Sequence, residues 1–228
     1  MNETFITALA LIPALVVAIV FHEVAHGYVA RLLGDPTASE QGRLTLNPLR
    51  HVDPVGTVVL PAILALVKAP IFGWAKPVPV NKYRLRNPRI GMMAVAAAGP
   101  GSNLVLAAIG AILLGLLARN QPAPPGQMVA LLALSLNYFI TVNVFLAFFN
   151  LLPVPPFDGS HIVEGLLPRG AARQFNRLRV IGLPLVFLLL LVIPSLFPQA
   201  NIIERVVLPP VEWISSHYMA LARIASGG

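Results

Sequence analysis

Three residues near the amino terminus have the types and spacing of a metal site. His22, Glu23 and His26 form the pattern H-E-x-x-H inside the apolar stretch from Val16 to Gly34. On a helix, residues four positions apart lie on one face, so both imidazoles can bind the same ion. Glu23 lies about 100° further round the helix, where its carboxylate can act as a general base toward a water molecule on that ion. An ionisable side chain is costly at membrane depth and usually marks a functional site.

Two histidines leave the site incomplete, because a catalytic zinc ion usually has three protein ligands and one open position for water. Asp158 is the leading candidate for the third ligand. It lies in NLLPVPPFDGSH, where prolines end the preceding apolar segment and Gly159 permits a tight turn. His161 is the competing ligand, supported only by its nearness in sequence. The plainer alternatives are a histidine pair hydrogen-bonded between helices and a turn aspartate before glycine.

The composition is that of a polytopic membrane protein. Of the 228 residues, 57% are hydrophobic and only 11% are charged, and the mean hydropathy is +0.78. The absence of cysteine excludes disulfides, thiolate ligands and cysteine nucleophiles. The net charge of +7 comes from basic residues between apolar segments, where they report membrane orientation, so we predict no nucleic-acid partner.

Four apolar segments are long enough to cross a hydrocarbon core, which takes about 20 helical residues. They are Phe5 to Leu33, Ile90 to Ala118, Met128 to Leu152 and Val180 to Phe197. The first lacks a basic leader region and a clear cleavage site, so we expect it to stay in the mature protein. A fifth segment, Val55 to Pro70, is short and interrupted by Pro61, and we predict that it is re-entrant. The tail from Asn201 to Ala225 either lies at the interface or forms a last span.

We therefore predict an all-α polytopic membrane protein with four to six transmembrane helices. Residues 1–228 form a single membrane-embedded domain, with core motifs in 11–165 and C-terminal helices in 180–225. Two stretches, Gly42 to Leu46 and Ala75 to Asn81, have the alternation or the prolines of edge strands, which predicts a short membrane-associated β element. Its residues Val78 and Val80 are predicted to pair with an unwound substrate segment by adding a strand.

Basic residues predict the orientation of the site. They gather in the connection 34–89 and in the connection that follows the third span. If the segment 55–70 does not cross the membrane, both connections lie on one side, which the positive-inside rule makes cytoplasmic; if it crosses, they lie on opposite faces. The first arrangement brings the carboxyl ends of the first and third spans together. His22, His26 and Asp158 then share one ion about 13 Å below the helix end.

Four motifs in order, HEVAH, GWAKPVPVN, AAAGPGSN and NLLPVPPFDG, resemble the site-2 protease family of intramembrane zinc metalloproteases, peptidase family M50. The resemblance covers about 11–165 and is closest to small prokaryotic members without PDZ or CBS domains. It implies zinc as the cofactor, with His22, His26 and Asp158 as ligands and Glu23 as the catalytic glutamate. Asn103 and Asn150 match polar positions that help hold the substrate or the reacting carbonyl. An equal alternative for Asn103 is bonding to backbone freed near a kink at Gly99 to Gly101.

The resemblance also implies the activity. We expect a zinc metalloendopeptidase in the cell membrane, with its active site toward the cytoplasm, that hydrolyses peptide bonds within or near transmembrane segments of membrane-tethered substrates. The chief alternative is a metal or proton transporter using the same histidine and aspartate cluster. A transporter has no special need for a glutamate between the histidines, and the two related halves common in transporters are not found. A non-catalytic binder of membrane segments is the remaining alternative.

Overall fold

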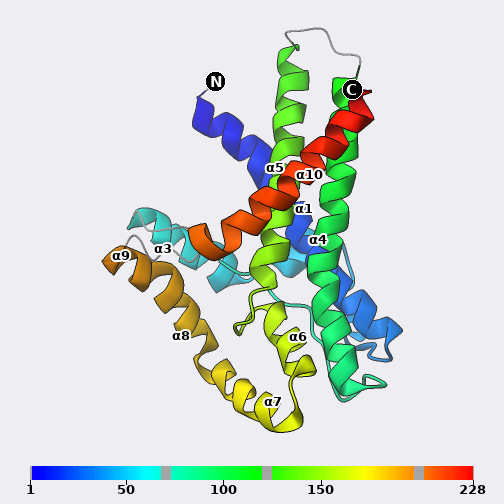
Figure 1. Cartoon of the computed structure of the whole chain (residues 1–228), viewed down its shortest axis with the longest axis vertical. Coiled ribbons are helices and arrows are strands. Elements are labelled where there is room, and N and C mark those ends of the chain that lie inside the picture. The colour runs from blue at the N-terminus through cyan, green and yellow to red at the C-terminus, as the bar shows by residue number, and fades with distance from the viewer. Residues whose placement is uncertain (1, 68–72, 120–124, 198–202, 228) are drawn as a thin grey trace.

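The computed structural model describes residues 2–67, 73–119, 125–197 and 203–227. Within these ranges the regular secondary structure is helical throughout (Figure 1). Three of the described helices have the length and hydropathy of membrane spans: α1 (Glu3–Leu32), α4 (Pro88–Ala118) and α5 (Gln127–Asn150). They coincide with the first three predicted spans, and they indicate an integral membrane protein.

One face of α1 is buried against α4 and α5. Its members recur at every fourth position: Ala10, Ala14, Ala18, His22, His26 and Ala30. Small side chains allow membrane helices to approach closely, and positions four apart lie on one side of a helix. Large apolar side chains such as Ile12 and Leu32 are exposed, as expected for a surface that faces lipid. The histidines therefore lie in a helix–helix contact.

The carboxy-terminal helix completes the core on the other side of α4 and α5. This helix, α10 (Leu208–Ser226), crosses both in Figure 1. A preceding π-helical turn, η6 (Ile203–Val207), contributes Val207 to the same cluster. The buried cluster consists of Ala107, Ala111, Leu114, Ile140, Val144, Val207, Val211 and Ala222. The tail thus packs on the two central spans, and the interfacial position and the last span both stay predicted alternatives.

The fourth predicted span is helical but is not one regular helix. Its turns change type along the chain: η3 (Arg177–Ile181), α8 (Gly182–Phe187), η4 (Leu188–Val192) and α9 (Ile193–Leu196). Pro184 and Pro194 lie within this run, and proline removes a backbone donor from the helical ladder. A total of four to six spans stays a prediction.

The segment predicted to be re-entrant is a short apolar helix. It consists of η2 (Pro54–Val59) and α3 (Leu60–Leu66). Thirteen helical residues extend about 20 Å, less than the roughly 30 Å of a hydrocarbon core. This length fits a segment that enters the membrane without crossing it.

The predicted β element is wrong for the described residues. Gly42–Leu46 and Ala75–Asn81 contain no strand, although they lie close together. Pro77 and Pro79 have no amide hydrogen to give to a ladder. The neighbouring carbonyls of Lys76 and Pro77 accept hydrogen bonds from the Arg43 side chain instead of from another strand. The Arg43 side chain thus bonds the carbonyls that a neighbouring strand would otherwise bond.

Candidate metal centre

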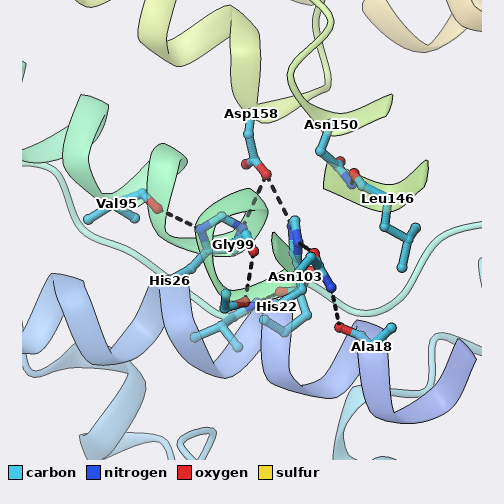
Figure 2. Close-up of polar contacts among 12 residues, drawn as sticks. Ala18, His22, His26, Val95, Gly99, Asn103, Leu146, Asn150 and Asp158 are labelled. Atoms are coloured by element: carbon cyan, nitrogen blue, oxygen red, sulfur yellow. Dashed lines mark hydrogen bonds and ion pairs between the residues drawn. The ribbon is translucent and has the colours of Figure 1, made fainter. Parts of the chain in front are cut away.

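The three predicted ligands lie together. His22, His26 and Asp158 present ligand atoms that all lie within 4.8 Å of one another. The two His Nε2 atoms lie 3.1 Å and 3.3 Å from the same oxygen, Asp158 Oδ2 (Figure 2). Both histidines are buried and the aspartate is partly exposed. The carboxyl ends of α1 and α5 therefore meet on one side, as the predicted topology requires.

Hydrogen bonding fixes which nitrogen of His26 faces the aspartate. His26 Nδ1 lies 2.7 Å from the backbone carbonyl oxygen of Val95 on α4. A carbonyl can only accept, so Nδ1 carries the proton. In the neutral ring, Nε2 then has a free lone pair that points toward Asp158, which is the state a metal ligand needs.

Asn103 fixes the other imidazole in the same way. Its side chain is fully buried, and its Oδ1 lies 2.6 Å from His22 Nδ1. Its Nδ2 donates to the Ala18 carbonyl at 3.1 Å and to Asn143 Oδ1 at 2.8 Å. Asn143 Nδ2 donates in turn to the Phe139 carbonyl. These bonds orient the amide so that Oδ1 accepts the Nδ1 proton of His22, which leaves the His22 Nε2 lone pair free.

This arrangement calls for a cation. With both rings neutral, two lone-pair nitrogens face the same carboxylate oxygen at 3.1 and 3.3 Å, and a positive charge, a metal ion or a proton on a ring, relieves their repulsion. Two imidazoles and one carboxylate are a donor set of catalytic zinc, which keeps a fourth position for water. The residues present therefore fit a zinc ion.

Gly99 allows α4 to approach the two imidazoles. A Cβ atom on this residue would lie 2.5 Å from His26 ring atoms and 2.6 Å from His22 Cε1. Asn103 follows one helical turn later on the same face and reaches His22. The AAAGPGSN motif thus gives the metal centre both its space and a hydrogen bond.

The helix that carries Asp158 is held at both ends. Asp158 is the first residue of α6 (Asp158–Leu166). Gly159 allows close contact with the end of α5, since a Cβ there would lie 2.2 Å from the Leu151 carbonyl oxygen. At the other end, Arg89 at the start of α4 donates to the carbonyls of Gly165 and Leu167, at 2.7 and 2.5 Å. These contacts fix the position from which Asp158 reaches the histidines.

Glu23 projects from α1 beside the ligands and contacts the irregular segment around Val78. Its Oε2 accepts the Val78 amide hydrogen at 2.8 Å. The Val78 side chain is buried, and Val80 is partly exposed. Their pairing with a substrate strand stays a prediction, and in this arrangement the Val78 amide is already engaged.

The remaining candidates lie around the centre. Asn150 donates to the Leu146 carbonyl of its own helix, and Figure 2 shows its side chain directed toward Leu146. His161 lies outside the group of three, and its Nδ1 accepts from Arg179 at 2.8 Å. Burial and the nearby charge of Arg179 lower the pKa of His161. The side-chain hydrogen bonds of Asn103 go to His22, Ala18 and Asn143, and none in the described residues goes to backbone near Gly99 to Gly101. Its substrate role stays a prediction.

Comparisons with known proteins agree with the metal site described above. Residues 120–193 match Peptidase family M50, a region that includes Asp158. YwhC of Bacillus subtilis, named as a candidate zinc metalloprotease, is 44% identical over 199 residues, covering 84% of this chain and 85% of YwhC. Rip2 of Mycolicibacterium smegmatis, named in the same way, is 32% identical over 176 residues, covering 77% of this chain and 63% of Rip2. No solved structure matches the chain.

Proposed function

The chain belongs to peptidase family M50, and from this premise we propose that it is an intramembrane zinc metalloendopeptidase. Its substrates are membrane-tethered proteins, cut within or near their transmembrane segments. The observation that carries the proposal is the group of His22, His26 and Asp158, in which both histidines, with Glu23 between them, lie on a helix long and apolar enough to span a membrane. A site of these four residues at that place has the parts of a metalloprotease.

The residues divide the chemistry between them. A zinc ion, when bound, polarises the scissile carbonyl and lowers the pKa of its water to about 7. His22 and His26 would hold the ion through Nε2, and Asp158 would hold it through a carboxylate oxygen. Glu23 accepts the proton of the attacking water on its carboxylate and delivers it to the leaving amine nitrogen. Asn150, Val78 and Val80 are the proposed substrate contacts.

The depth of the site supports cleavage inside the membrane. His22 precedes the end of α1 at Leu32 by ten residues, which is about 15 Å of helix. The irregular backbone of residues 73–81 lies against this part of α1 through Glu23. Such backbone is tolerated at membrane depth only where it is buried in protein or lines a wet cavity. Glu23 and Asp158 are partly exposed at this depth, which supports access of water to an unwound transmembrane segment there. The flanking basic connections favour a site open toward the cytoplasm.

Cleavage of single-span membrane proteins by the purified protein tests the proposal. We expect product termini, located by mass spectrometry, within or next to the transmembrane segment. Glu23→Gln should retain zinc and lose at least about 100-fold in rate, because it removes the general base and keeps the ligands. Cutting only in soluble loops would contradict intramembrane activity. Undiminished cleavage by Glu23→Gln would contradict the mechanism, and metal flux through vesicles that survives this change would favour a transporter.

A further inference from the structure

An irregular segment from Trp74 to Asn81, here called the strap, crosses the part of α1 that carries Glu23. Its first residue is tied to η2, because the Trp74 amide donates to the Gly56 carbonyl and Thr57 Oγ1 donates to the Trp74 carbonyl. Gly56 has no side chain, which leaves room for the Trp74 indole. A Cβ atom on Gly56 would lie 2.3 Å from Trp74 Nε1. One end of the strap is thus fixed by the short apolar helix.

Two buried charged side chains hold the rest of the strap. Arg43 Nη2 donates to the Lys76 carbonyl at 2.9 Å and to the Pro77 carbonyl at 3.4 Å. Asp35 Oδ2 accepts the Asn81 amide hydrogen at 2.6 Å. Arg43 is 8% exposed and Asp35 is 0% exposed. A charged group is rarely buried so fully without hydrogen-bond partners. Strap backbone accepts from Arg43 Nη2 and donates to Asp35, whereas Arg43 Nε is buried without a partner among the described residues.

Between these anchors the strap delivers one backbone donor to Glu23. The Val78 amide lies 2.8 Å from Glu23 Oε2. Gly27, one residue after His26, permits this approach, because a Cβ there would lie 2.7 Å from Val78 Cγ1 and 2.6 Å from Leu44 Cδ2. One oxygen of the carboxylate is therefore held by the strap, and the other is left for water.

We propose that Arg43 is a positioning residue for the reaction proposed above. It holds the carbonyls of Lys76 and Pro77. The Pro77 carbonyl belongs to the same planar peptide unit as the Val78 amide, so Arg43 also places the amide that orients the Glu23 carboxylate. The inference rests on the proposed function, since it gives Glu23 the role of general base. Orientation matters here because a misplacement of about 1 Å can cost about 100-fold in rate.

For the Val78 amide this role is an alternative to the pairing with substrate proposed above, and the two roles differ in a measurable way. If the Val78 amide binds the substrate backbone, its loss weakens substrate binding and raises KM. If it orients Glu23, its loss lowers kcat and leaves KM nearly unchanged. Val78→Pro removes the amide hydrogen from a segment that already contains Pro77 and Pro79. Val78→Ala keeps the amide and removes the side-chain packing against Gly27, so it is the matched control.

The decisive measurement is kcat and KM per zinc-loaded molecule for a single-span substrate. Val78→Pro should lower kcat about 10- to 100-fold relative to Val78→Ala, with KM changed less than about threefold. Arg43→Met should lower kcat by a similar factor, and Arg43→Lys, which keeps a cationic donor, should recover most of it. Arg50→Met, the same change at an exposed arginine of the same connection, should leave kcat within about twofold.

The outcomes separate this inference from the proposed function. If the wild type does not cleave, or if Glu23→Gln cleaves equally well, the proposed function fails and the inference fails with it. If wild-type cleavage depends on Glu23 but Arg43→Met keeps full kcat per bound zinc, the positioning role alone is overturned. A lower melting temperature or zinc content with normal kcat per loaded molecule also overturns it, because that pattern indicates a purely structural arginine. If Val78→Pro does not fold, the Arg43→Met and Arg43→Lys pair decides.

Discussion

Gly99→Ala is the sharpest perturbation of the metal centre. The added methyl group would lie 2.5 Å from His26 Nε2 and Cε1 and 2.6 Å from His22 Cε1. Carbon atoms in contact normally lie about 3.5–4.0 Å apart, so the overlap is about 1 Å. The imidazoles cannot easily move away, because their Nδ1 atoms are held at 2.6 and 2.7 Å by Asn103 and Val95.

The expected loss of zinc affinity follows from how little metal–ligand distances can vary. Ligand distances in metal sites are fixed to within about 0.2 Å, far less than the overlap. Disturbing the groups that orient ligands typically costs about 10- to 100-fold in metal affinity, which is about 1.4–2.7 kcal/mol. We expect at least this loss of zinc affinity for Gly99→Ala. Overpacking of the α1–α4 contact should also destabilise the zinc-free fold by about 1–3 kcal/mol.

Chelator competition on detergent-purified protein measures the zinc affinity, and thermal unfolding with excess chelator measures the zinc-free fold. Gly101→Ala is the matched control, because a Cβ at Gly101 meets nothing within 4 Å. It should bind zinc like the wild type and gain up to about 1 kcal/mol in stability from higher helix propensity. Equal zinc affinities in the two variants would refute the claim that Gly99 makes room for the ligands.

Two further predictions concern a buried amide and a buried carboxylate. Asn103→Leu should lower zinc affinity about 10- to 100-fold, because it leaves the His22 ring without its orienting acceptor. Asn150→Leu should not lower zinc affinity, because in the described residues the Asn150 side chain bonds only within its own helix. Equal zinc affinities of the two variants in chelator competition would argue against the orienting role of Asn103. Burial would raise the pKa of Asp35, but hydrogen bonds from Thr37 and the Asn81 amide outweigh it and hold the pKa below its ordinary 3.8. A lowered folded-state pKa means that the carboxylate stabilises the fold above its unfolded pKa and that this contribution is lost as the pH falls through the folded value. The wild type should therefore melt above Asp35→Asn at neutral pH, with an advantage that shrinks below about pH 4; a constant difference in melting temperature down to pH 3 would contradict this.

The metal ligands could be predicted because each leaves a local mark in the sequence. His22 and His26 have the spacing of one helix face, and their place in an apolar segment is itself a signal. Asp158 was identified by the prolines and glycine around it, which end a helix where a ligand is needed. The meeting of the ends of α1 and α5 followed from the distribution of basic residues. The local sequence pattern and the distribution of charge were thus enough to predict the metal ligands.

The surroundings of the ligands could not be predicted, because they depend on contacts between distant segments. The prolines of the strap show which amide donors are missing. They do not show that Arg43 donates hydrogen bonds to strap carbonyls 33 and 34 residues away in sequence. Nothing local marks Asp35 as the acceptor for Asn81. Asn103 matches a substrate-binding position by resemblance, and that role stays a prediction. Its hydrogen bond to His22 at 2.6 Å leaves no local mark in the sequence. The predicted β element rests on the alternation in Gly42–Leu46 and on the same prolines in Ala75–Asn81. Such prolines do not separate an edge strand from a loop bound by side chains, because both have this composition.

The metal centre is also a packing problem. Four alanines of the buried α1 stripe share their face with His22 and His26, whose rings need far more space than a methyl group. Gly99 on α4 supplies that space, so the ring volume gained on one helix is matched by a missing side chain on the other. The metal centre is therefore closed where α1 packs against α4, including the part of α1 around Ala18. The partly exposed groups, Glu23 and Asp158, lie toward the strap and α6, and we infer that water reaches the site from that side.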